Sequence, residues 1–229
     1  MSTWIPLESN PEVLTKYIHK LGVSPAWSLS DVIGLDDEML EWIPRPAKAL
    51  ILLFPITDTY EKHRLEEHER IKMTAETEKH PADLFYMRQI THNACGTVAL
   101  IHSVANNKDV DIANGVLKNF LKKAQTLSPE ERGEALEKDE DFTAGHQELA
   151  QEGQTNADDH MKTIHHFIAF VNKDGLLYEL DGRKSFPIQH GKTSEETFIH
   201  DAAKVCKEFM ARDPNDMRFT IMVLAAAQD

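Results

Sequence analysis

The sequence is organised around one stretch, Gln89-Ile90-Thr91-His92-Asn93-Ala94-Cys95-Gly96-Thr97-Val98-Ala99-Leu100-Ile101-His102. From residue 94 to residue 105 it is almost wholly apolar, which predicts a helix buried at the centre of the domain. Cys95 falls in the first turn, where unpaired backbone N–H groups and the helix dipole favour a thiolate. Gln89 supplies a neutral amide that can stabilise an oxyanion. The stretch therefore predicts a rigid platform for a candidate nucleophile, although a free cysteine more often serves as a small buried apolar residue.

Two segments downstream supply the partners that such a thiol needs. Residues 165–171 and 176–181 are rich in strand-forming residues and are separated by a turn that contains glycine, which predicts a β-hairpin. Because side chains alternate along a strand, only one of the adjacent histidines 165 and 166 can face Cys95. Asp181 ends the second strand. A cysteine followed by a histidine and an aspartate at this range predicts Cys-His-Asp hydrolytic chemistry.

The remaining elements are expected around this centre. Helical periodicity and caps predict helices over residues 11–21, 36–42, 57–78, 110–124, 129–139 and 194–211. Strands are predicted over residues 27–32, 47–55 and 219–226, with an edge segment over 184–190. Residues 150–162 are polar and aperiodic, which is typical of a functional or disordered loop. This order indicates an α+β fold in which helices flank a central, mostly antiparallel sheet.

Composition indicates one soluble globular domain over residues 1–229. The chain is 41% hydrophobic, and its apolar runs are too short to span a membrane. We expect no secretory signal at the N-terminus and no disulfide framework, because the only two cysteines are Cys95 and Cys206. A reducing intracellular compartment fits this cysteine usage. Cys206 lies on the apolar stripe of a predicted helix, so we expect it to be a core residue.

The formal net charge of −13 argues against a nucleic-acid partner. The excess is concentrated between residues 126 and 160, where eleven acidic residues face two basic ones. One interpretation is a solvated helical face and loop. The other is an electrostatic guide that attracts a basic protein tail.

Together these motifs resemble the ubiquitin carboxyl-terminal hydrolase family of cysteine proteases. The resemblance rests on Gln89 with residues 91–97, on the strand His166-Phe167-Ile168-Ala169, and on Leu177-Tyr178-Glu179-Leu180-Asp181-Gly182-Arg183. It extends to residues 4–11, 44–46, 53–56, 128–132 and 212–214, and so covers nearly the whole chain. The chain looks like the short, single-domain branch of that family.

The resemblance implies a papain-like arrangement with a knotted backbone. Cys95 would attack the carbonyl of the last glycine of ubiquitin, and Gln89 would help bind the oxyanion. His166 would act as base and then as acid, with Asp181 orienting its imidazole. Residues 144–161 would form a crossover loop over the cleft, which would limit leaving groups to small or flexible adducts and precursor extensions.

The resemblance also implies a partner, which is ubiquitin, bound through both its C-terminal tail and its globular body. By analogy we expect Leu7, Glu152 and Asn156 to contact it. We expect no cofactor, no metal, no nucleic acid and no membrane partner, and we expect a cytoplasmic monomer.

Three alternatives stay open at this point. The chain could be a ubiquitin-binding module that holds or stabilises free ubiquitin with little turnover. It could instead hydrolyse adducts of another ubiquitin-like modifier. A zinc site built from His160, His165 and His166 is the weakest alternative, because no cysteine pair and no glutamate-containing helical motif accompanies these histidines.

Overall fold

A computed structural model describes residues 4–73, 80–152 and 164–228. The strands in chain order are β1 (Trp27–Asp31), β2 (Ala47–Pro55), β3 (His165–Lys173), β4 (Leu176–Leu180), β5 (Ile188–Lys192) and β6 (Thr220–Ala226). The helices are α1 (Pro11–Lys20), α2 (Asp37–Leu40), α3 (Asp58–Met73), α4 (Cys95–Ala105), α5 (Val116–Ala124), α6 (Pro129–Glu137), α7 (Glu140–Ala150) and α9 (Phe198–Arg212). The described residues include no helix with both the length and the apolarity needed to cross a membrane.

The strands form one six-stranded sheet in the order β1-β6-β2-β3-β4-β5, and every pairing is antiparallel. The predicted central strand, β2, lies between β6 and β3, and the predicted edge segment becomes β5. The hairpin of β3 and β4 turns through Asp174 and Gly175, both of which have positive φ angles. The predicted α+β class and the antiparallel sheet are therefore confirmed.

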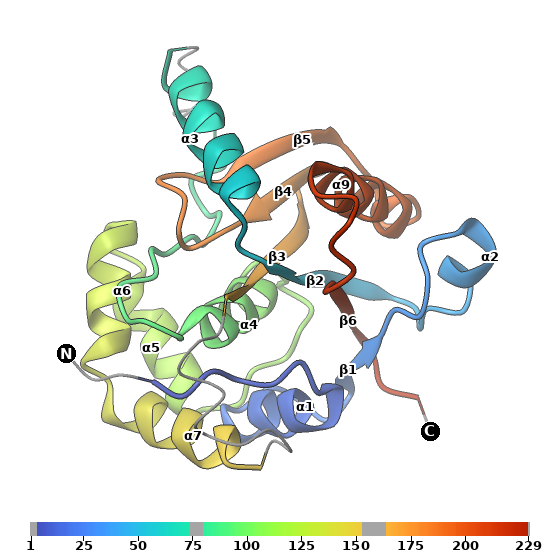
Figure 1. Ribbon diagram of the computed structural model, residues 1–229. Helices are drawn as coiled ribbons and strands as arrows, with labels where there is room; N and C mark the ends of the chain where they lie inside the picture. The colour runs from blue at the N-terminus through green and yellow to red at the C-terminus, as the bar shows by residue number, and fades with distance from the viewer. Residues whose placement is uncertain (1–3, 74–79, 153–163, 229) are drawn as a thin grey trace.

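Helices cover both faces of this sheet (Figure 1). On one face α4 packs against β3 and β2, with α1, α5, α6 and α7 around it in a single apolar cluster. On the other face α9 and α2 cover a second cluster, to which α3 adds Tyr60. The alternation of β3 divides its side chains between the two clusters: Phe167, Ala169 and Val171 belong to the first, and Ile168 and Phe170 to the second. The buried central position predicted for α4 is confirmed.

N-cap side chains explain where α1 and α6 begin. The Asn10 side chain accepts hydrogen bonds from the backbone of Glu12 at 3.0 Å and Val13 at 3.3 Å, as expected of an N-cap. Ser128 and Glu131 form a reciprocal capping box that starts α6.

Two predicted helices begin too early. Residues 110–115 are not helical: Ile112 bridges to Val23, so this segment is extended beside the end of α1, and α5 starts only at Val116. In the second case, Ser194 and Thr197 exchange side-chain to backbone hydrogen bonds, each 3.1 Å long, in a turn that delays α9 to Phe198.

One helix was missed altogether. Residue 139 was expected to end a helix, but the Asp139 carboxylate instead caps a new one, α7, by accepting the backbone N–H of Phe142 at 3.2 Å. The helix continues to Ala150, so the predicted crossover loop cannot start at residue 144. The rest of the predicted loop, from residue 153 onward, lies outside the described residues, as does Asn156.

Candidate active site

Cys95 is the first residue of α4, and its N-cap, Ala94, offers no side-chain cap. Cys95 as a whole residue is partly buried. Burial raises the pKa of Cys95, but a hydrogen bond and the charge of His166, with the backbone N–H groups of Phe167 and Gly96, outweigh it and leave the pKa below its ordinary value. The first turn of α4 thus favours a thiolate.

His166, on β3, is the partner of that thiolate. Its Nε2 lies 2.6 Å from Oδ1 of Asp181, and both side chains are almost completely buried. Burial by itself would lower the pKa of His166, but the charge and hydrogen bond of Asp181, together with Cys95, raise it to about 9. The site therefore favours an imidazolium beside a thiolate, which is the ion pair that a cysteine peptidase uses.

Asp181 is held on both carboxylate oxygens. Oδ2 accepts the hydroxyl of Tyr60 at 2.6 Å, and Oδ1 accepts the backbone N–H of Arg183 at 2.8 Å in addition to His166. Burial raises the pKa of Asp181, yet the charge and hydrogen bond of His166, the charge of Lys184 and the Tyr60 hydrogen bond hold it well below its usual range. The carboxylate is thus ionised and fixed in orientation.

The hairpin register explains why these groups meet. Ala169 of β3 pairs with Leu180, the last residue of β4. Beyond that pair β4 no longer covers β3, and Asp181 leaves the strand next to His166. The uncovered edge at Phe167 receives the first turn of α4, where the Phe167 backbone N–H faces Cys95. Cys95 therefore meets two residues of a distant hairpin where one of its strands ends.

The structure also separates the two adjacent histidines. His166 lies edge-on to the ring of Phe54, 5.7 Å between centroids, on the sheet face covered by α9. His165 pairs across the sheet with Pro55, and burial and the charge of Arg218 lower its pKa. Only His166 approaches Cys95 and Asp181, in line with the choice made from the sequence.

Gln89 is fixed beside the same loop. Its backbone N–H donates to the carbonyl oxygen of Gly182 at 2.9 Å, and its side-chain amide donates to the carbonyl of Thr91 at 3.1 Å. A Cβ atom at Gly182 would lie 2.9 Å from the Cβ of Gln89, so only glycine fits there without a shift. One amide hydrogen of Gln89 remains for another acceptor.

The three residues expected to contact ubiquitin have different surroundings. Leu7 is largely buried and covers the first turn of α4, where a Cβ at Gly96 would meet it at 3.1 Å. Glu152 is exposed just after α7 and pairs with Lys16 at 3.0 Å. Asn156 is not among the described residues. Nothing in the structure assigns these residues a binding role.

Sequence reasoning missed Tyr60, which the structure places directly on Asp181. The helix predicted over residues 57–78 is dense in charged residues, a pattern that indicated an exposed helix. The available signal was a single aromatic residue in the first turn of an otherwise polar helix.

Cys206 provides the contrast predicted for it. It is completely buried in α9, and burial, with the charge of Glu179, raises its pKa far above the ordinary value. Its place in the core is confirmed.

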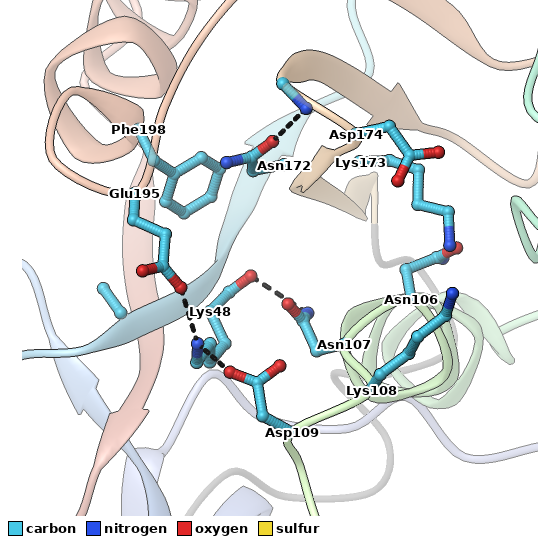
Figure 2. A pocket seen from close by; sticks show the side chains of 12 residues that line it. Lys48, Asn106, Asn107, Lys108, Asp109, Asn172, Lys173, Asp174, Glu195 and Phe198 are labelled. Carbon is cyan, nitrogen blue, oxygen red and sulfur yellow. Dashed lines mark hydrogen bonds and ion pairs between the residues drawn. The ribbon is translucent and has the colours of Figure 1, made fainter.

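A separate cavity of about 250 Å³ lies at the other end of α4 (Figure 2). At its wall Lys48 pairs with Asp109 and Glu195, and the Asn107 amide donates to the backbone carbonyl of Lys48 at 3.0 Å. Cys95, His166, Asp181 and Gln89 are not among the residues that line it. Elsewhere in the described residues, no group of three histidine, cysteine or acidic side chains is arranged to hold a metal, and His160 lies outside them.

Comparison with known proteins agrees with this geometry. The family described as "Ubiquitin carboxyl-terminal hydrolase, family 1" matches residues 4–211. A ubiquitin carboxyl-terminal hydrolase of Drosophila melanogaster is 77% identical over the full length of both chains. Human ubiquitin carboxyl-terminal hydrolase isozyme L1 is 46% identical, covering 97% of this chain and 98% of its own.

Among solved structures, the UCH37 catalytic domain of Trichinella spiralis bound to ubiquitin vinyl methyl ester is similar, with a TM-score of 0.78 and 25% sequence identity. The match covers 99% of this chain and 97% of that domain. The chain therefore belongs to family 1 of the ubiquitin carboxyl-terminal hydrolases, which are cysteine peptidases that act as deubiquitinases.

Proposed function

We propose that Cys95 is the nucleophile of this enzyme and that its substrate is ubiquitin carrying a small or flexible adduct on its C-terminal glycine. The observation that supports this assignment best is the continuous contact from Cys95 through His166 to Asp181, with a lowered thiol pKa and an imidazole pKa raised to about 9. An uncharged pair of this kind would lack a ready nucleophile at neutral pH.

In the proposed acylation step, the Cys95 thiolate adds to the carbonyl carbon of the terminal glycine. The developing oxyanion accepts a hydrogen bond from the free amide hydrogen of Gln89. As the tetrahedral intermediate collapses, the bond to the leaving nitrogen breaks and the His166 imidazolium gives that nitrogen its proton. The products are a free amine and a thioester between Cys95 and ubiquitin.

In the proposed deacylation step, a water molecule adds to the thioester carbonyl while neutral His166 takes its proton. Collapse returns the Cys95 thiolate beside the His166 imidazolium and releases the C-terminal carboxylic acid of ubiquitin, which loses its proton to solvent and leaves as the carboxylate. Asp181 keeps its charge throughout and holds the imidazole in one orientation.

Ubiquitin recognition is inferred from the family and from a relative solved with a ubiquitin electrophile. We propose that ubiquitin binds through its tail and its globular body, with Leu7, Glu152 and Asn156 among the contacts. The papain-like relationship, the backbone knot, the monomeric state and the cytoplasmic location stay predictions of the same kind.

The test is mass spectrometry of the purified protein after incubation with ubiquitin vinyl methyl ester. We expect one ubiquitin adduct per chain, and peptide mapping should place it on Cys95. The matched variants are Cys95→Ser, which should give no adduct, and Cys206→Ser, which should react like the wild type.

Labelling of Cys206, or labelling that survives Cys95→Ser, would contradict the proposal. Absence of any adduct while unmodified ubiquitin still binds would favour the alternative, a module that holds ubiquitin with little turnover. Absence of both reaction and binding would point to another ubiquitin-like modifier.

A further inference from the structure

We propose that α3 is a positioning clamp for Asp181, with the Tyr60 hydroxyl as its main contact. This inference rests on the proposed role of Asp181. The clamp consists of three α3 residues that contact three of the four residues following β4: Tyr60 with Asp181, Glu61 with Arg183, and Glu67 with Lys184.

The Tyr60 contact fixes the carboxylate itself. The hydroxyl donates to Oδ2 of Asp181 at 2.6 Å, while Oδ1 serves His166 and the Arg183 backbone. With a donor on each oxygen, rotation about the bond that carries the carboxylate would break at least one hydrogen bond. Tyr60 is 3% exposed, so water cannot readily replace its hydroxyl.

The two ion pairs hold the backbone that follows. Arg183 Nη1 lies 2.7 Å from Oε1 of Glu61. The ammonium of Lys184 lies 2.5 Å from Glu67 and 2.5 Å from Glu179, and all three side chains are buried. Removing one member of such a buried set leaves an uncompensated charge, so the set strongly favours a single arrangement.

A second tyrosine contacts the backbone of the same segment. The Tyr86 hydroxyl lies 2.7 Å from the carbonyl oxygen of Asp181 and 2.5 Å from that of Lys184. Tyr86 precedes Gln89 by three residues. Residues 181–184 are therefore held both by α3 and by the segment that leads to the proposed oxyanion donor.

The composition of α3 agrees with this role. Its buried residues are Tyr60, Glu67 and Ile71, which share one helical face. Tyr60 and Glu67 make polar contacts with residues 181–184, the Asp181 loop. The buried face of α3 is therefore polar where it meets this polar loop. Figure 1 shows α3 standing at the β4 and β5 end of the sheet, projecting beyond the body of the domain. A helix with so small an apolar face contributes little core, and its contacts with the loop account for its position.

The first test is Tyr60→Phe, which removes the hydroxyl and keeps the ring. We expect kcat for ubiquitin C-terminal amide hydrolysis to fall roughly tenfold, because loss of a residue that orients a functional group typically costs about 10- to 100-fold. KM should stay within twofold, since Tyr60 is buried away from any protein substrate. The control is Tyr178→Phe. The Tyr178 ring is also buried, but its hydroxyl makes only a long hydrogen bond of 3.4 Å to Gln189, so the kcat of this variant should match the wild type.

The second test asks whether Tyr60 acts through the carboxylate. In an Asp181→Asn background, adding Tyr60→Phe should change kcat by less than twofold. Glu61→Gln tests the clamp from its partly exposed end without opening the core. We expect a two- to threefold loss of kcat with unchanged KM, because a partly exposed ion pair contributes little.

An equal loss from Tyr60→Phe in both backgrounds would overturn the inference, as would a rise in KM with kcat unchanged. So would wild-type kcat in both Tyr60→Phe and Glu61→Gln. Failure of the proposed function would look different, because the wild-type protein would then form no adduct on Cys95 with ubiquitin vinyl methyl ester, whatever the state of Tyr60.

Discussion

Two buried histidines approach the first turn of α4 from different sides, and their surroundings differ in one respect. His166 meets Cys95 and lies against the carboxylate of Asp181. His146, on α7, meets Thr97, two residues further along α4, with 2.9 Å between Nδ1 and the threonine hydroxyl. Its other nitrogen, Nε2, lies 2.5 Å from the carbonyl oxygen of Ile5.

The pKa values of the two imidazoles move in opposite directions. Burial lowers the pKa of His146 to about 4, because its hydrogen-bond partners are neutral and cannot offset the loss of hydration. The same burial acts on His166, but the adjacent carboxylate and thiol raise its pKa to about 9. The buried carboxylate beside His166 therefore explains why this imidazole is charged while that of His146 is neutral.

The two sides of the turn thus have different tasks. The neutral His146 ties the N-terminal segment to α4 and α7, with the ring of Trp4 4.3 Å from its own, while the Asn93 amide donates to the Trp4 carbonyl at 2.9 Å. This side is structural. The side with His166 carries the charges that the proposed chemistry requires.

The largest predicted effect comes from Asp181→Asn, which would give His166 a neutral partner like those of His146. We expect kcat/KM to fall by about 10⁴-fold, the loss typical of removing the charge that orients a catalytic histidine. The pKa of His166, followed by NMR, should fall below its ordinary value while that of His146 stays unchanged. A loss of kcat/KM of less than tenfold would contradict the view that the Asp181 charge distinguishes His166 from His146.

Gln89→Ala should act on the His166 side without changing any charge. We expect kcat to fall by about 10²- to 10³-fold, or about 3 kcal/mol in the barrier, the usual loss of one oxyanion donor. The pKa of the Cys95 thiol, measured by the pH dependence of alkylation, should not move. The exposed Gln125 offers a matched control, and Gln125→Ala should retain wild-type kcat. If the alkylation profile shifts with kcat, Gln89 acts on the thiol and not on the oxyanion.

The His146 side should govern stability in acid. An unfolded histidine has a pKa of about 6.5, whereas that of folded His146 is about 4. As pH falls from about 6.5 to 4, the unfolded state binds the proton before the folded state does. The stability that is present above pH 6.5 is therefore lost as the pH falls through this range. The expected loss is about 3 kcal/mol from this residue.

Urea unfolding at pH 7 and at pH 4 measures this change. Buried His102, whose pKa burial also lowers to about 4, contributes in the same direction. His146→Gln should therefore reduce the pH dependence of the unfolding free energy without abolishing it. An unchanged slope in that variant would mean that His146 accepts its proton without unfolding.

The smallest predicted effect concerns the acidic surface around His146. Part of that charge is already compensated, since Glu148 pairs with Lys20 and Glu152 with Lys16. If the remainder attracts the basic ubiquitin tail, higher salt should raise KM by about two- to threefold and affect kcat less. Glu140→Gln, at the start of α7, should raise KM slightly, while Glu208→Gln, on α9 across the sheet, should not. A salt-insensitive KM would leave only the solvated-face interpretation.

Local patterns predicted much of this site. The apolar run after Cys95 indicated a buried helix, and the hairpin of β3 and β4 followed from strand residues around a glycine turn. These inferences succeed because helix caps, periodicity and alternation depend on residues a few positions apart. The same patterns failed where local signals compete: Asp139 starts α7 by capping it where one helix was expected to end, and the residues before Val116 pair with the end of α1.

By itself, the sequence determined the sheet-forming segments, the central helix and the position of Cys95 at its start. Only the tertiary structure decided which buried histidine is charged, because that depends on whether an anion lies beside it. It also decided that Tyr60 would hold a carboxylate 121 positions away in the chain. Contacts of that range leave no periodic trace, since they form only where one strand ends and distant segments meet.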